Sequence, residues 1–317
     1  MKSSFGIGVA VLLLLAGHQI ACAQTPPFLF QWGGQGIGPG QLDGPHDLAI
    51  DSFGNVYVAD TRNFRIQKFT SEGTYLLEWG GFGSDPGKFW YPFGIAIDAA
   101  GDVYVADLIN HRIQKFTASG VFVRTWGIQG EAPGEFNGPY DVAIGADGSV
   151  YVADEENHRV QRFDSDGKFI SQFGVDGPGQ LLLPTSIAID ASGRVFVADQ
   201  LLNQITVFDQ DGNFLARWGA PGQLIIPSGI AIVGSSLYEA DPNTSRVQKF
   251  TLDGTFLLQW GTLGTGPGQF NSPAGVAVTP AGRVYVADQS DHRIQVFDDS
   301  PVAVEARSWG AVKAKYR

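Results

Sequence analysis

Short apolar segments separated by glycine-bearing turns recur along most of the chain. One unit lies between residues 92 and 126, where Pro-Phe-Gly-Ile-Ala-Ile, Val-Tyr-Val-Ala-Asp and Arg-Ile-Gln-Lys-Phe precede a segment that ends in Trp126. Segments this short, rich in β-branched and aromatic residues, are typical of β-strands, and no stretch of any length has the 3.6-residue period of a helix. The pattern predicts short antiparallel strands joined by tight turns.

The residue that closes the second segment gives the period of the repeat. An aspartate stands there six times, at spacings of 47, 47, 45, 42 and 47 residues: Asp60, Asp107, Asp154, Asp199, Asp241 and Asp288. Six units of four strands are typical of a β-propeller. We expect an all-β, six-bladed β-propeller of four-stranded antiparallel blades, with blade cores near residues 45–79, 92–126, 139–173, 184–218, 227–260 and 273–297.

The aromatic-ended segment occurs seven times against six aspartate-ended ones. The extra copies are Phe-Leu-Phe-Gln-Trp at 28–32 and the stretch before Trp309, where Pro301 replaces the usual turn glycine. A propeller must close to avoid exposed sheet edges. We therefore predict that residues 28–32 supply the outer strand of the last blade, that the propeller covers residues 24–300, and that 301–317 form a loosely packed tail.

Residues 1–23 resemble a secretory signal peptide. Lys2 precedes an apolar run from Phe5 to Gly17, and the Ala-Cys-Ala run at 21–23 has small residues where signal peptidase cleaves. An uncleaved anchor and lipidation of Cys22 are the alternatives. The sequence predicts a secreted or periplasmic protein with no transmembrane segment after cleavage.

Charge and cysteine content exclude several functions. The formal net charge is −11, and loss of residues 1–23 would remove one lysine and no acid. A chain this acidic repels the negatively charged phosphate backbone of a nucleic acid. We therefore expect no nucleic-acid partner. Cys22 is the only cysteine, which excludes disulfides and thiol catalysis from the cleaved chain.

The repeat resembles the NHL repeat, which is named for an Asn-His-Leu run. The resemblance covers residues 45–297 and is closest at Asn110-His111-Arg112 and Asn157-His158-Arg159. It implies a six-bladed propeller. Propellers of this kind serve as extracellular sensors, as protein- or RNA-binding modules and as the peptidyl-hydroxyglycine amidating lyase, and related six-bladed families include metal-dependent lactonases and the streptogramin lyase. The resemblance alone does not choose among these functions.

The residue after the proline that begins each innermost strand should ring one mouth of the central channel. These residues are His46, Phe93, Tyr140, Thr185, Ser228 and Ala274. Aromatic rings beside carboxylates suit a peptide, glycan or cationic ligand. Our candidate ligand-binding set on this face is His46, Asp47, Phe93, Tyr140, Asp141, Ser186, Glu155 and Glu156, and we also place Phe89, Trp90 and Tyr91 there.

Other motifs favour structural roles. An arginine follows the closing aspartate by five residues in every unit except the fourth, where Gln204 stands, and such a recurring pair is expected to fix a hairpin. His111, His158 and His292 share one repeat position, which indicates the same. The Asp-x-Asp-Gly strings at 164–167 and 209–212 lack the remaining ligands of a calcium loop and fit hairpin turns better.

Two functions remain open. The first is a non-catalytic binding propeller for a protein, peptide or glycan, without a cofactor. The second is a metal-assisted lyase or lactonase that would hold zinc or calcium at His46, Asp47 and Asp141. The resemblance to the amidating lyase implies zinc-binding histidines in Pro-His contexts, but only His46 matches, and a catalytic zinc site typically takes three protein ligands.

Overall fold

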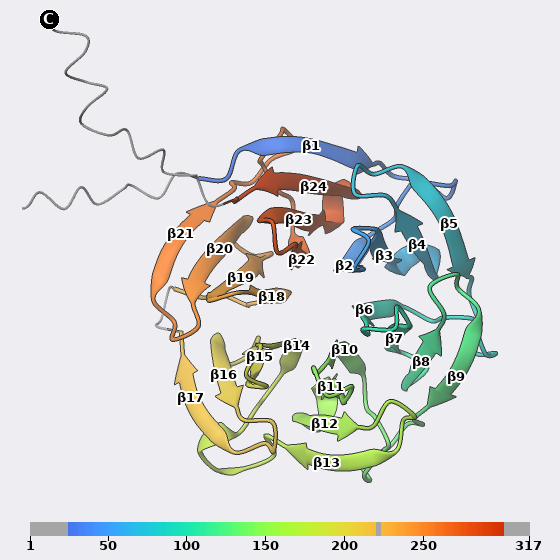
Figure 1. Cartoon of the computed structure of the whole chain (residues 1–317), viewed down its shortest axis with the longest axis vertical. Coiled ribbons are helices and arrows are strands. Elements are labelled where there is room, and N and C mark those ends of the chain that lie inside the picture. The colour runs from blue at the N-terminus through green and yellow to red at the C-terminus, as the bar shows by residue number, and fades with distance from the viewer. Residues whose placement is uncertain (1–24, 220–222, 301–317) are drawn as a thin grey trace, which may run out of the picture.

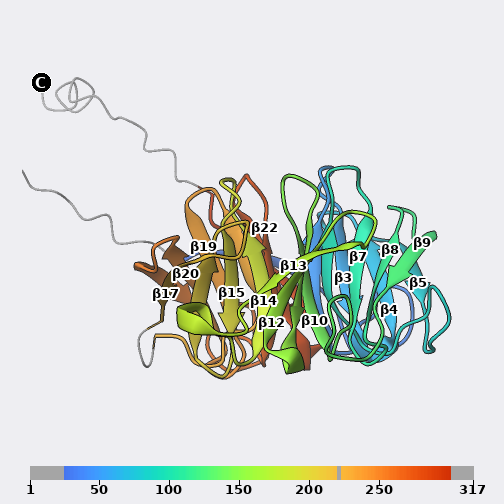
Figure 2. The ribbon, with the colours of Figure 1, turned by 90° about the horizontal axis from the view of Figure 1, so that it is seen from below.

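The computed structural model describes residues 25–219 and 223–300. It contains six separate four-stranded antiparallel sheets arranged as blades around a central axis (Figure 1). Side by side, the blades form a disc with loops on both faces (Figure 2). This confirms the predicted all-β, six-bladed propeller. No helix in the described part of the chain is long and apolar enough to span a membrane.

Each blade has four strands in order from the axis outward. The innermost strands are β2 (Pro45–Ile50), β6 (Pro92–Ile97), β10 (Pro139–Ile144), β14 (Pro184–Ile189), β18 (Ile230–Val233) and β22 (Pro273–Val278). The second strands are β3 (Val56–Asp60), β7 (Val103–Asp107), β11 (Val150–Asp154), β15 (Val195–Asp199), β19 (Ser236–Asp241) and β23 (Arg283–Asp288). The third strands are β4 (Arg65–Phe69), β8 (Arg112–Phe116), β12 (Arg159–Phe163), β16 (Gln204–Phe208), β20 (Arg246–Thr251) and β24 (Arg293–Asp298). The outer strands are β5 (Tyr75–Gly80), β9 (Phe122–Trp126), β13 (Phe169–Phe173), β17 (Phe214–Trp218), β21 (Phe256–Trp260) and β1 (Phe28–Gly33). Short 3-10 turns are η1 (Thr61–Asn63), η2 (Glu155–Asn157), η3 (Gly177–Gly179) and η4 (Gln289–Asp291).

The ring closes in the predicted way. Strand β1 pairs antiparallel with β24, with Phe28 opposite Phe297 and Trp32 opposite Ile294, and the two strands run together at the rim (Figure 1). The last blade therefore combines the first strand of the chain with its last three. The predicted signal peptide, 1–23, and tail, 301–317, lie outside the described residues.

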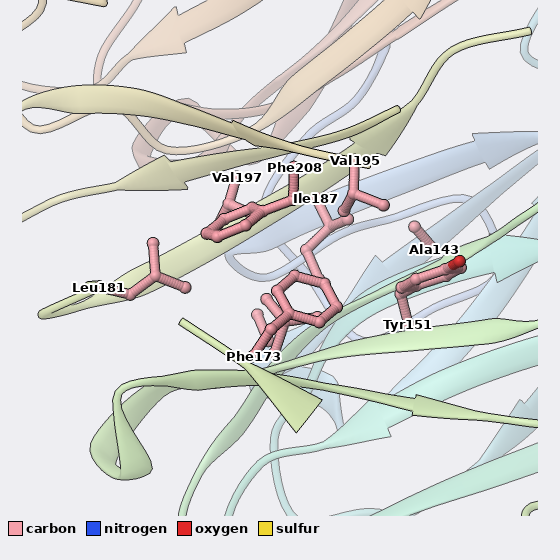
Figure 3. Close-up of a cluster of buried hydrophobic side chains, with 10 residues drawn as sticks. Ala143, Tyr151, Phe173, Leu181, Ile187, Val195, Val197 and Phe208 are labelled. Carbon is pink, nitrogen blue, oxygen red and sulfur yellow. The ribbon is translucent and has the colours of Figure 1, made fainter. Parts of the chain in front are cut away.

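The hydrophobic core lies between neighbouring blades. Between blades three and four, Tyr151 and Phe173 from one blade meet Ile187 and Phe208 from the next (Figure 3). Second strands such as Val56–Asp60 are buried along their whole length. Since both faces of such a strand are covered, it consists of β-branched and aromatic residues rather than alternating with polar ones.

Blades are also joined at their outer turns. Gly73 has the left-handed backbone conformation (φ 81°) expected for its turn, and a Cβ there would lie 2.6 Å from the Trp32 ring of the preceding blade. Gly120 stands in the same relation to Trp79. In five of the six blades, the terminal aromatic of the preceding outer strand therefore requires both the conformation and the missing side chain of the turn glycine.

The recurring aspartate and arginine form the predicted buried ion pair. In blade one, Arg65 Nε donates to Asp60 Oδ2 at 2.7 Å, and its other nitrogens donate to carbonyls of the preceding inter-blade loop. Gln67, fully buried, also bonds Asp60. In blade five the pair is stretched to 3.5 Å between Arg246 and Asp241. The pairs are structural, because each fixes a loop between blades.

Candidate functional site

The innermost strands surround the central axis (Figure 1), and the six residues predicted to ring one channel mouth lie at or just before the starts of these strands. Blades one to three contribute the rings of His46, Phe93 and Tyr140, whereas blades four to six contribute only Thr185, Ser228 and Ala274. The mouth is therefore aromatic on one half and lined by small side chains on the other.

The next residue of each inner strand forms a second ring, which consists of Asp47, Gly94, Asp141, Ser186, Gly229 and Gly275. A Cβ on Gly94 would lie 2.4 Å from Asp141 Oδ1, and one on Gly275 would lie 2.8 Å from Asp47 Cα. Two of the glycines therefore make room for the aspartates of neighbouring blades.

Both aspartates accept hydrogen bonds across a blade boundary. The backbone N–H of Ile95 donates to Asp47 Oδ2 at 3.0 Å. Asp141 Oδ2 accepts from the Ile187 N–H at 2.8 Å and from the Ser186 hydroxyl at 2.9 Å. The Ser186 hydroxyl in turn accepts from the Ile230 N–H of blade five at 3.1 Å. These side chains couple the inner strands of neighbouring blades.

A small pocket lies between the two rings. Its lining includes His46, Asp47, Tyr140, Asp141 and Ser186, so the structure brings five of the eight predicted site residues together. Its volume of about 10 Å³ is roughly what the centre of one water molecule needs. Further along the axis a cavity of about 240 Å³ is lined mainly by apolar side chains of the inner strands.

The buried His46 and the partly buried Tyr140 form a pair in this pocket. His46 Nε2 and the Tyr140 hydroxyl are 3.1 Å apart, while His46 Nδ1 is buried without a hydrogen-bond partner. Burial lowers the pKa of His46 to about 4, so the imidazole is neutral at physiological pH. Burial, with the nearby charges of Glu155, Asp141 and Asp47, raises the pKa of Tyr140.

The two aspartates are electrostatically coupled. Burial and the charge of Asp141 raise the pKa of Asp47 well above its usual range. Burial also raises the pKa of Asp141 to about 6, against hydrogen bonds from Ile187, Ser186 and Val142 that lower it. Two carboxylates this close in a poorly solvated place resist double ionisation.

An aromatic seam runs from the channel mouth to the rim of blade two. We define it by seven residues in successive contact: His46, Tyr140, Phe93, Tyr91, Phe64, Phe82 and Trp90. The ring centroids of Phe93 and His46 are 4.1 Å apart, and those of Phe82 and Trp90 are 5.6 Å apart. At the outer end, Phe82 is 62% exposed and Trp90 is 43% exposed.

Tyr91 occupies a backbone conformation that disfavours bulky residues. Its φ is 63°, and the equivalent Gly44 and Gly138 of the neighbouring blades have φ of 59° and 73°. Placing a tyrosine where glycine fits costs on the order of 1 kcal/mol. The ring of Tyr91 bridges Phe64 and Phe93, so this strained position makes the seam continuous.

The remaining predicted site residues lie beside the seam. Glu155 is close enough to Tyr140 to affect its pKa, and burial together with Glu156 raises the pKa of Glu155 itself to about 7. Glu156 is exposed. The placement of Phe89 on this surface was wrong, because its side chain is fully buried and packs on Phe116.

Sequence reasoning missed Phe64 and Phe82. Phe64 stands at the position that holds His111, His158 and His292 in other blades, and this departure was the available signal. Those histidines have φ between 52° and 56°; Nδ1 of His111 and of His292 accepts a backbone N–H of the next inter-blade loop. They are structural, as predicted.

The metal hypothesis has no supporting ligand set in the described residues. Within residues 25–219 and 223–300, no three His, Cys, Asp or Glu side chains are grouped to hold a metal ion. His46 Nε2 bonds Tyr140, and both aspartates bond backbone N–H groups. His46, Asp47 and Asp141 therefore do not fit a three-ligand zinc site. In the Asp-x-Asp-Gly turn at 164–167, Asp164 Oδ1 accepts two backbone N–H groups.

Comparison with known proteins identifies the repeat. The family model described as NHL repeat matches residues 42–69, 89–116, 136–163 and 270–297. Four of the six blades carry NHL repeats. The matched repeats are those of blades one, two, three and six. Blade four lacks the arginine at Gln204, and blade five has the stretched pair.

Relatives of this NHL propeller share limited sequence. A human protein named NHL repeat-containing protein 3 is 60% identical over 35 residues, which are 11% of this chain and 10% of that protein. A streptogramin B lyase structure superposes with a TM-score of 0.59 at 21% identity, covering 79% of this chain and 78% of that one.

A second structure, a catalytically inactive virginiamycin B lyase from Staphylococcus aureus with quinupristin, has a TM-score of 0.60 at 19% identity, covering 83% of this chain and 82% of that one. At such identities the similarity establishes the fold alone.

Proposed function

We propose that this NHL propeller is a non-catalytic module that binds a protein, peptide or glycan ligand outside the cytoplasm, using its channel-mouth face. The observation that carries the proposal is the aromatic seam, which leads from exposed rings at the rim to a polar pocket on the axis. Aromatic side chains provide large contact areas at low cost in conformational entropy. The signal-like residues 1–23 support a location outside the cytoplasm.

Two features support selection of this face for binding. Tyr91 keeps an unfavourable backbone conformation that continues the seam. Phe82 and Trp90 expose apolar surface side by side, and adjoining exposed apolar groups commonly mark interaction sites.

Selection of a random peptide display library on the purified protein tests the proposal. We expect enriched peptides to bind the wild type and to lose about tenfold or more in affinity, which is about 1.4 kcal/mol, on a Phe82→Ser, Trp90→Ser variant. Leu263→Ser is the matched control, because Leu263 holds the position of Phe82 in blade six and is 73% exposed. Equal binding to all three proteins would reject the seam as the binding surface.

A lyase is the second candidate, favoured by the pair of His46 and Tyr140 beside two carboxylates and by the named activity of the structural neighbours. The same experiment separates the two functions. Chromatographic conversion of a selected peptide by the wild type, abolished by His46→Ala, would support the lyase; an unaltered peptide supports binding.

A further inference from the structure

The partly buried Asp47 and the buried Asp141 have no cationic partner among the described residues, whereas five of the six aspartates that close the second strands pair with an arginine. Asp60 and Asp107, for example, each bond an arginine within 2.9 Å. By contrast, no lysine or arginine of the described residues lines the pocket or the channel cavity. Buried carboxylates are normally paired, because a charge removed from water is costly.

A second observation in the same pocket points to a ligand. His46 is 8% exposed and lines the pocket, yet its Nδ1 has no hydrogen-bond partner. The imidazole is neutral at physiological pH, so it does not repel a cation. A hydrogen-bonding group placed in this pocket would meet His46, Tyr140 and the two carboxylates together.

The size of the pocket selects among cations. About 10 Å³ accepts one atom of the size of a water molecule. An ammonium nitrogen is a compact point charge on a flexible stem, whereas a guanidinium is a planar group of several atoms. The pocket therefore fits an ammonium better than an arginine side chain, and the ring of Tyr140, which lines the pocket, would contact the apolar stem.

We infer that the channel mouth binds a primary ammonium group, with Asp47 and Asp141 as its counter-ions and the aromatic seam as the surface for the rest of the ligand. This inference rests on the proposed function and makes it more specific. The ligand class is a peptide or protein that presents a lysine side chain or a free amino terminus, or a small alkylamine, which shares the same chemistry.

Ammonium binding should weaken as the pH falls. Protonation of the carboxylate pair removes the counter-charge, and Asp141, with a pKa of about 6, loses its charge between pH 7.5 and pH 5. The other titratable groups that face the pocket are His46, Tyr140 and Glu155. His46 stays neutral above its pKa of about 4. Loss of one carboxylate charge between pH 7.5 and pH 5 reduces affinity about tenfold.

Saturation-transfer NMR with n-butylammonium chloride tests the inference on the full propeller, with n-butanol as the uncharged analogue. We expect butylammonium to bind at pH 7.5, to bind about tenfold more weakly at pH 5, and to lose binding in Asp47→Asn and Asp141→Asn. Glu131→Gln, an exposed carboxylate on the same face, should bind like the wild type. Three results would each overturn the inference. They are binding of butanol as strong as that of butylammonium, binding of butylammonium by the two aspartate variants as strong as by the wild type, and complete displacement of butylammonium by equimolar sodium or potassium.

Lysine-containing members of the selected peptides separate this inference from the proposed function. Replacing the lysine with methionine should abolish a seam-dependent interaction if the ammonium is the anchor. Unchanged binding would leave the binding face established and the ammonium pocket rejected. If butylammonium binds but no selected peptide depends on the seam, the proposed binding function is rejected. The ammonium pocket then stands, and its ligands are small amines. Because Asp141 supports neighbouring strands, the pH series on the wild type serves when Asp141→Asn fails to fold.

Discussion

At the residue scale, blade five contains a carboxyl group where the other blades contain an apolar side chain. Glu239 stands in its second strand at the position of Val58, Val105, Val152, Val197 and Val286. It is fully buried, one oxygen accepts from Gln248, and the other oxygen is unpartnered. Burial, followed by the charge of Asp241, raises the pKa of Glu239 to about 8. The side chain is therefore protonated in the folded protein at neutral pH.

Replacement of this carboxyl should stabilise the protein at high pH. Because the folded-state pKa lies above the usual value of 4.5, Glu239 costs nothing below about pH 4.5 and progressively destabilises the fold up to about pH 8. We expect Glu239→Gln to raise the free energy of unfolding at pH 9 by a few kcal/mol and to change it little at pH 4.5, as measured by urea unfolding.

The converse substitution is the control for this prediction. Val286→Glu places a carboxyl at the same position of blade six and should create a loss of stability that grows with pH. A Glu239→Gln variant with the pH dependence of the wild type would contradict the assignment.

At the element scale, the residues that recur in every repeat form the hairpins, whereas residues that depart from the repeat form the candidate site. Each inter-blade loop holds one buried apolar residue: Leu42, Phe89, Phe136, Leu181, Leu224 and Phe270. Phe89 is the buried residue of its loop, whereas the neighbouring Trp90 is exposed. Aromatic character alone suggested a surface role for both, whereas the recurrence of an apolar residue in all six units indicates core.

The Asp–Arg pairs should contribute unequally among blades. Arg112→Ala leaves Asp107 buried without its cation, and it also removes three hydrogen bonds to the preceding loop. We expect a loss of about 3–5 kcal/mol. Arg246→Ala in blade five removes a longer ion pair of 3.5 Å with Asp241 and two hydrogen bonds, to the Gln259 side chain and to the Gln223 carbonyl. It should cost less, about 1–2 kcal/mol. Urea unfolding of both variants checks the contrast, and equal losses would refute it.

Features carried by the recurring residues could be predicted from the sequence, whereas features carried by departures from the repeat could not. Strand order, blade number and closure by 28–32 were predictable, because six repeats report one local geometry six times. The channel-mouth ring was predictable from a position after proline. The seam was not, because it requires that Phe64 of blade one contact both Phe82 and Tyr91 of the following inter-blade loop. The unpaired state of Asp47 and Asp141 likewise depends on which side chains reach the axis.

At the scale of the whole molecule, one strand holds the ring closed. Loss of β1 would expose the edge of β24 and the apolar faces that Phe28, Phe30 and Trp32 cover. The six blades otherwise depend only on contacts between neighbours, so the gap would lie between blades six and one.

Removal of residues 24–33 should therefore destabilise the entire propeller. We expect the melting temperature to fall by roughly 10 °C or more, given the apolar area exposed, with increased aggregation from the free edge. A synthetic peptide of residues 25–34 should restore stability in trans, whereas a scrambled peptide should not. An unchanged melting temperature after truncation would show that closure contributes little.

Closure by β1 also imposes an order of events on the nascent chain. Phe28 is synthesised near the beginning, yet its partner Phe297 emerges only after nearly all of the remaining sequence. At roughly 5–20 residues per second, the wait lasts on the order of tens of seconds. During that time five blades can assemble while an apolar strand has no partner. The propeller thus begins with the segment that it needs last, and β1 has to stay unpaired until β24 is available.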